Sequence, residues 1–87
     1  MAVFKIQTTR ISLKEAQDFV GGYVELLRVT HPELGPSQLL VADNIFDQSP
    51  DDVNLEATEL CKQAGLRVQT IGVLGNALLL TGDAIWG

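Results

Sequence analysis

Few side chains in this sequence are equipped for nucleophilic catalysis. There is one cysteine, Cys61, and one histidine, His31, which precedes a proline. A nucleophile needs a base beside it, but we expect Cys61 on the buried face of a helix, where a free thiol behaves as a small apolar group. One cysteine and one histidine also cannot form a closed zinc site. We therefore expect no catalytic residue, no metal ligand and no cofactor-binding residue.

Acidic side chains are the second chemical resource of the sequence. No lysine or arginine occurs between Val29 and Cys61, whereas that stretch contains most of the acidic residues. Their spacing lacks the alternating ligands and central glycine of an EF-hand loop, so we interpret them as solvated acids of loops and helix starts. An acidic surface also speeds encounter with a basic partner. We therefore count the following as candidate interface residues: Asp43, Asp47, Asp51, Asp52 and Glu56.

Length and composition narrow the class of protein further. A chain of 87 residues is expected to form a single domain over residues 1–87. The net charge of -5 argues against direct nucleic-acid binding, which needs a basic face. One cysteine cannot form an internal disulfide, and the N-terminus shows no signal peptide or membrane span. We expect a protein of the reducing cytoplasm.

The first half of the chain reads as strand, helix, strand, loop and strand. Residues 3–9 alternate in a strand-like pattern, and Ser12 and Glu15 have the S-x-x-E spacing that opens a helix, predicted over 13–20. A strand is predicted over 23–29. The prolines and glycine of residues 30–37 indicate a loop, and the next strand is predicted over 38–43.

The second half reads as a helix followed by two strands. The helix has two candidate starts, Ser49 followed by Pro50, or Asn54 as the cap. Its apolar residues keep helical spacing from Val53 to Ala64. Strands are predicted over 66–72 and 76–82. The element order βαββαββ predicts an α+β fold, with a mainly antiparallel sheet of four to five strands and two helices.

Glycines mark the predicted turns. Glycine adopts the left-handed conformation that ends many helices at no steric cost, which suits Gly21 and Gly65. Gly22 then allows an immediate reversal into the following strand, and Gly75 marks the bend before the last strand. We favour this tight turn for Gly21 and Gly22 over the alternative, a phosphate-binding nest.

Several short stretches resemble one known family. These are VGGYVE at residues 20–25, LLVADN at 39–44, the N-x-x-A-T pattern that begins at Asn54, and GNALLLTG at 75–82. Together they resemble a family of small phage and plasmid proteins classified as domain of unknown function 3846. In that family a glycine turn usually stands where this chain has the longer IFDQSPDDV. The resemblance implies a phage or mobile-element protein in a bacterial cytoplasm, and no activity.

The C-terminal residues suggest self-association. Successive leucines of the last predicted strand point to opposite faces of the sheet, and we expect two helices to cover only one of these faces. A homodimer would cover the other, with Leu79, Ile85 and Trp86 as candidate interface residues. The alternatives are that Trp86 folds back onto the core, and that a loop carrying Ile45 and Phe46 covers the second face.

The leading hypothesis for function is therefore a small non-enzymatic protein that binds a host or phage protein through its acidic segment or a sheet edge. The first alternative is an oligomeric protein that sequesters a small nucleotide-like ligand, although Arg10, Arg28 and Arg67 are scattered in the sequence. The second alternative is an acidic mimic of DNA.

Overall fold

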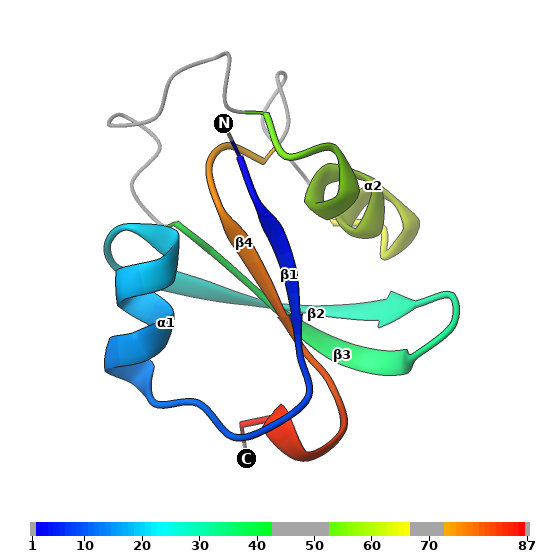
Figure 1. The fold of residues 1–87 in the computed structure, drawn as a ribbon. Coiled ribbons are helices and arrows are strands. Elements are labelled where there is room, and N and C mark those ends of the chain that lie inside the picture. The colour runs from blue at the N-terminus through cyan, green and yellow to red at the C-terminus, as the bar shows by residue number, and fades with distance from the viewer. Residues whose placement is uncertain (1, 43–52, 67–72, 87) are drawn as a thin grey trace.

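The computed structural model of the chain describes residues 2–42, 53–66 and 73–86. Within these ranges the chain forms strands, two α-helices and one 3-10 turn (Figure 1). No helix in the described ranges is long and apolar enough to cross a membrane. In chain order the elements are β1 (Phe4–Gln7), α1 (Leu13–Val20), β2 (Val24–His31), β3 (Gly35–Ala42), α2 (Leu55–Gln63), β4 (Ala77–Leu80) and η3 (Gly82–Ala84).

The described strands form one mixed sheet in the order β1-β4-β3-β2. β3 pairs antiparallel with both β2 and β4, whereas β4 pairs parallel with β1. The predicted α+β class is confirmed. The parallel pair was not predicted, because short connections along the sequence say nothing about how the first and last strands pair. The strand predicted over 66–72 lies almost entirely outside the described residues.

The two helices lie on opposite faces of this sheet (Figure 1). Leu78 and Leu80 of β4 pack with Ala16 of α1, whereas Leu79 packs with Cys61 of α2. The expectation that both helices cover one face, leaving the other for a partner subunit, is therefore wrong. Each helix packs its apolar side chains into one of the two core clusters, so each face of the sheet has a helix on it.

The boundaries of α1 agree with its predicted capping residues. The Ser12 Oγ accepts a hydrogen bond from the Glu15 backbone N–H at 3.1 Å. At the other end Gly21 has a φ of 90°, the left-handed conformation that a Cβ atom disfavours. The Gln17 carbonyl accepts from the N–H groups of both Gly21 and Gly22, at 2.8 and 3.0 Å. These bonds close the turn that leads into β2.

Of the two predicted starts of α2, at Ser49 or at Asn54, the structure has Asn54 as the N-cap. Val53 forms an isolated antiparallel bridge with Leu74, and Asn54 has extended backbone, so the helix begins only after them. The Asn54 Oδ1 accepts from the Ala57 backbone N–H at 3.2 Å. Gly65, with a φ of 75°, follows the last turn of α2 as predicted.

The β2–β3 hairpin is longer than predicted. The loop expected over 30–37 is wrong, since β2 continues to His31 and β3 already begins at Gly35. The His31 Nδ1 accepts hydrogen bonds from two backbone N–H groups of the intervening turn, at 3.0 and 3.2 Å. Pro36 lies in a part of β3 that pairs with β2 alone, where the loss of an N–H donor is tolerated.

Two asparagines hold the start of β1 against the segment that leads into β4. The Asn54 Nδ2 donates to the carbonyl oxygens of Val3 and Gly75, at 3.1 and 3.0 Å. The Asn76 Oδ1 accepts from the Val3 N–H at 2.9 Å, and the Asn76 Nδ2 donates to the Phe19 carbonyl at 2.9 Å. These bonds fix the parallel register at the start of both β1 and β4.

Candidate functional site

β2 is an outer strand of the described sheet. It has eight residues, against four in β1 at the opposite edge. Within the described ranges no strand pairs with its outer side. A row of unpaired N–H and C=O groups is a template for an added strand. The outer side of β2 is therefore the longest open edge of the sheet in the part of the chain that the structure describes.

The side chains along this edge combine apolar and charged groups. Leu26 is 38% exposed, and Tyr23, immediately before the strand, is 77% exposed. Glu25 and Arg28 are also exposed. Charges on an edge strand disfavour indiscriminate pairing, whereas exposed apolar groups favour contact. The edge is thus suited to a selective partner.

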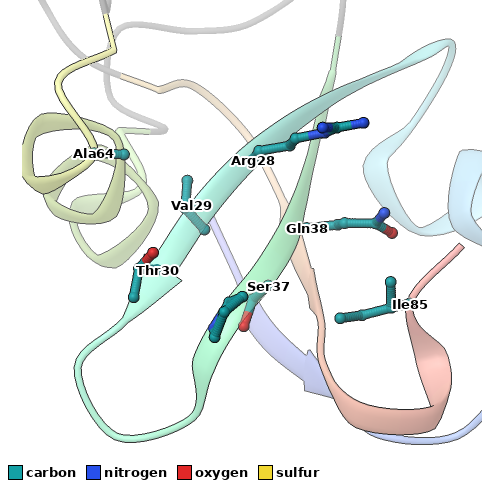
Figure 2. A pocket seen from close by; sticks show the side chains of 8 residues that line it. Arg28, Val29, Thr30, Ser37, Gln38, Ala64 and Ile85 are labelled. Carbon is teal, nitrogen blue, oxygen red and sulfur yellow. The ribbon is translucent and has the colours of Figure 1, made fainter.

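A surface hollow of about 380 Å³ lies against the hairpin (Figure 2). We name it the hairpin hollow. Arg28 and Gln38, which are paired across β2 and β3, line it together with Ile85 from the C-terminal segment. Its other lining residues include Thr30, Pro36 and Ala64. The hollow therefore joins the β2 edge to a residue predicted to form an interface.

Leu79, Ile85 and Trp86, the C-terminal residues predicted to form an interface, differ in how deeply they are buried. The Trp86 N–H and carbonyl form hydrogen bonds of 2.7 and 2.8 Å with the Gln38 side chain, and the indole Nε1 donates to the Ile11 carbonyl at 3.2 Å. Trp86 is half-buried against the core on the α1 side. Ile85 is 38% exposed. Leu79 has no exposed surface, because β4 lies inside the sheet, and so it cannot line an interface.

The acidic candidates are only partly described. Glu56 is exposed in the first turn of α2. The remaining predicted acidic interface residues, and the two apolar residues expected to cover a sheet face, lie outside the described residues: Asp43, Asp47, Asp51, Asp52, Ile45 and Phe46.

A second hollow, of about 440 Å³, lies beside α2, and we name it the α2 groove. It lies between α2, β1 and the end of the hairpin. Phe4, Pro32, Leu55 and Leu60 supply its apolar lining. Glu56 and Glu59 are among its polar residues.

The Gly21–Gly22 turn is not arranged to hold an anion. Both backbone N–H groups already donate to the Gln17 carbonyl, so they do not point at a free site. The hollow at this turn, of about 470 Å³, is also lined by Asp18. A carboxylate there would repel a phosphate, so the alternative of a phosphate nest is not supported at these residues.

Cys61, which was considered as a possible nucleophile, is buried. Cys61 has no exposed surface, and burial, with a smaller contribution from the charge of Glu25, raises the pKa of its thiol above the ordinary value of 9.0. A raised pKa leaves the thiol protonated and unreactive. Within the described ranges there is no group of three or more His, Cys, Asp or Glu side chains that could hold a metal ion.

The arginines proposed to meet around a nucleotide are not brought together at the described hollows. Arg28 lines the hairpin hollow, whereas Arg10 is exposed in the segment between β1 and α1. Arg67 lies outside the described residues. A single guanidinium does not supply the cluster of cations that phosphates attract.

Sequence reasoning missed the polar residues that organise these surfaces. Gln38 and Asn76 were each placed in a predicted strand, without the bonds that Gln38 makes to Trp86 and Asn76 makes to Val3 and Phe19. Asn54 is 1% exposed, although it was considered only as a helix cap. A polar residue that begins or interrupts an apolar run is a signal for such a role, but the sequence does not reveal its distant partners.

Comparison with known proteins adds no relative: no family model, no curated protein and no solved structure matches the chain.

Proposed function

We propose that this protein is a small non-enzymatic binding protein that recognises another protein through the outer edge of β2. The observation that carries the proposal is an eight-residue edge strand that contains the exposed Leu26 and is preceded by the exposed Tyr23. An extended segment added to a sheet edge gains main-chain hydrogen bonds, and its side chains supply specificity.

The hairpin hollow supports the same surface. A strand added along β2 runs past Arg28, whose side chain is exposed at this hollow (Figure 2). An acidic side chain of the partner pairs with Arg28, which favours a particular partner over an arbitrary strand.

A second copy of the chain is one partner that fits this edge. Two β2 strands can pair antiparallel about a two-fold axis, which makes the contact self-complementary. The homodimer is therefore proposed at β2 and not at β4, which already has a strand on each side. The resemblance to phage and plasmid proteins is the basis for proposing an accessory role for a phage or mobile element in the host cytoplasm.

The test compares two variants with similar chemistry at different surfaces. Leu26→Lys places a charge on the proposed edge, and Leu13→Lys places the same charge on the exposed first residue of α1. Tagged proteins are incubated with bacterial lysate at low salt, and recovered proteins are identified by mass spectrometry. Light scattering gives the mass of each purified variant.

We expect Leu26→Lys to lose the partner, or the dimer, that the wild-type protein and Leu13→Lys retain. Retention by Leu26→Lys would show that the edge is not the binding surface. Recovery of no partner, together with a monomeric mass for the wild type at tens of micromolar, would count against protein binding altogether.

A further inference from the structure

The α2 groove is a separate surface from the β2 edge. Its floor includes Leu60, which is 6% exposed, and the half-buried Phe4 of β1. Leu55, the first residue of α2, stands at the groove with 74% of its surface exposed. Pro32 approaches from the end of the hairpin. The groove therefore offers an apolar contact surface that the described part of the chain leaves largely uncovered.

The charges around this groove have one sign. Glu56 and Glu59 are three residues apart on α2, so they project from the same side of the helix, and both are exposed. No lysine or arginine is among the described residues that line the groove. A partner that complements this surface therefore has an apolar side chain with basic side chains beside it.

His31 is among the residues that line the groove. Its Nδ1 accepts hydrogen bonds from the backbone N–H groups of Glu33 and Leu34, at 3.0 and 3.2 Å. These two bonds hold the imidazole at the end of the hairpin.

The geometry points to the α2 groove as a docking site for a basic amphipathic segment of a partner protein. An apolar side chain of that segment packs on Phe4 and Leu55, and lysine or arginine residues beside it pair with Glu56 and Glu59. The apolar contact supplies affinity, and the charge pairs select the partner and speed its encounter. This inference is independent of strand addition at β2.

The probe for this site is a synthetic helical peptide, labelled with fluorescein, that has leucine on one face and lysine on the other. A control peptide keeps the leucines and has glutamate in place of each lysine. Binding to the full chain is followed by fluorescence anisotropy at low salt. We expect the lysine peptide to bind, the glutamate peptide to fail, and added salt to weaken the binding.

Matched double variants separate local pairing from general attraction to an acidic protein. Glu56→Gln with Glu59→Gln removes the groove charges, whereas Glu15→Gln with Asp18→Asn removes two exposed charges, equally spaced, from α1 on the other face of the sheet. Two exposed charge pairs account for about a fivefold loss of affinity in the first variant. The second variant keeps the wild-type affinity.

A second matched pair tests the apolar contact. Leu55→Gln and Leu13→Gln each change the exposed first residue of a helix, at α2 and α1 respectively. We expect Leu55→Gln to weaken peptide binding by about tenfold, because it removes the apolar wall of the groove, and Leu13→Gln to leave binding unchanged.

Three outcomes would overturn the inference. Equal losses in the two double variants would mean that the peptide senses only net charge. Equal losses of peptide affinity in Leu55→Gln and Leu13→Gln would show that the peptide does not contact the groove. Loss of the peptide by Leu26→Lys, with retention by Leu55→Gln, would place it at the β2 edge and leave the proposed function standing.

Discussion

β4 and β2 both carry adjacent leucines, yet they use them differently. Leu78, Leu79 and Leu80 of β4 have no exposed surface, whereas Leu26 of β2 is 38% exposed. β4 has a strand on each side and a helix on each face, while β2 has a strand partner on one side only, within the described ranges. Position in the sheet, and not local hydrophobicity, therefore decides which leucines are buried.

The same contrast assigns different roles to the two strands. A leucine at the centre contributes to stability, because removing it leaves a cavity between packed side chains. A leucine at the edge contributes little to the fold and remains free to contact another molecule. Substitutions at these strands can therefore separate folding from binding.

The largest expected effect is at the centre of the sheet. Leu79→Ala should lower the free energy of unfolding by about 3 kcal/mol, within the range for buried leucines. Leu26→Ala, the matched change at the edge, should lower it by less than about 1 kcal/mol. Urea denaturation of both variants measures the difference. Equal losses would mean that β2 is as enclosed as β4.

The next largest effect concerns the asparagine that anchors the start of β4. Asn54→Ala removes a helix cap and the two hydrogen bonds donated to the carbonyls of Val3 and Gly75, of which the second is buried, for a total of about 2 to 3 kcal/mol. Ser12→Ala removes only an exposed cap at α1 and should lower the free energy of unfolding by about 1 kcal/mol.

Asn54→Asp sharpens this second prediction. It keeps the oxygen that caps α2 but loses the two hydrogen bonds donated by Nδ2. We expect thermal melting to show a loss greater than that of Ser12→Ala. If Asn54→Asp lowered the melting temperature less than Ser12→Ala did, Asn54 would act only as a helix cap.

A smaller effect is expected where the chain turns into β2. Gly21→Val places a Cβ atom on a residue with a φ of 90° and should destabilise the fold by about 1 to 2 kcal/mol. Gly21→Asn should have a smaller effect, because asparagine tolerates the left-handed conformation better. Equal melting temperatures for Gly21→Val and the wild type would contradict the turn geometry.

The sequence indicated the local features of this fold and missed its long-range ones. The caps at Ser12 and Asn54 and the helix end at Gly21 follow from the chemistry of neighbouring residues, and they were predictable. The parallel pairing of β1 with β4 joins residues more than 70 positions apart, such as Phe4 and Ala77. No periodicity encodes such a pairing.

The candidate sites were harder to predict for the same reason. The hairpin hollow brings Ile85 to Arg28, and the α2 groove brings Phe4 to Leu55. Each pair comes from distant parts of the chain, so neither surface exists until the sheet has formed. Glu56 was predicted as an interface residue from the absence of nearby cations, which is a local property.

The smallest expected effect is a dependence of stability on pH, which comes from the buried thiol of Cys61 and the charge of Glu25 on the edge strand β2. Burial first, and the charge of Glu25 on β2 second, raise the pKa of the Cys61 thiol above 9.0. The unfolded thiol then ionises at a lower pH than the folded one. This contribution to stability is full below the unfolded pKa and is lost as the pH rises through the folded pKa.

The comparison with Cys61→Ala isolates this thiol, because the other groups that titrate at high pH are present in both proteins. Urea denaturation between neutral pH and a pH above 9.0 should show the wild type losing stability relative to the variant. Because the thiol is enclosed, a thiol reagent should label the native wild type no faster than the protein unfolds. If the wild type and Cys61→Ala lost stability equally as the pH rose, the thiol would not be buried as described. Rapid labelling of the native protein would likewise show that α2 leaves the thiol exposed. Glu25→Gln should reduce the relative loss without removing it, because burial is the larger cause and the edge strand contributes only its charge.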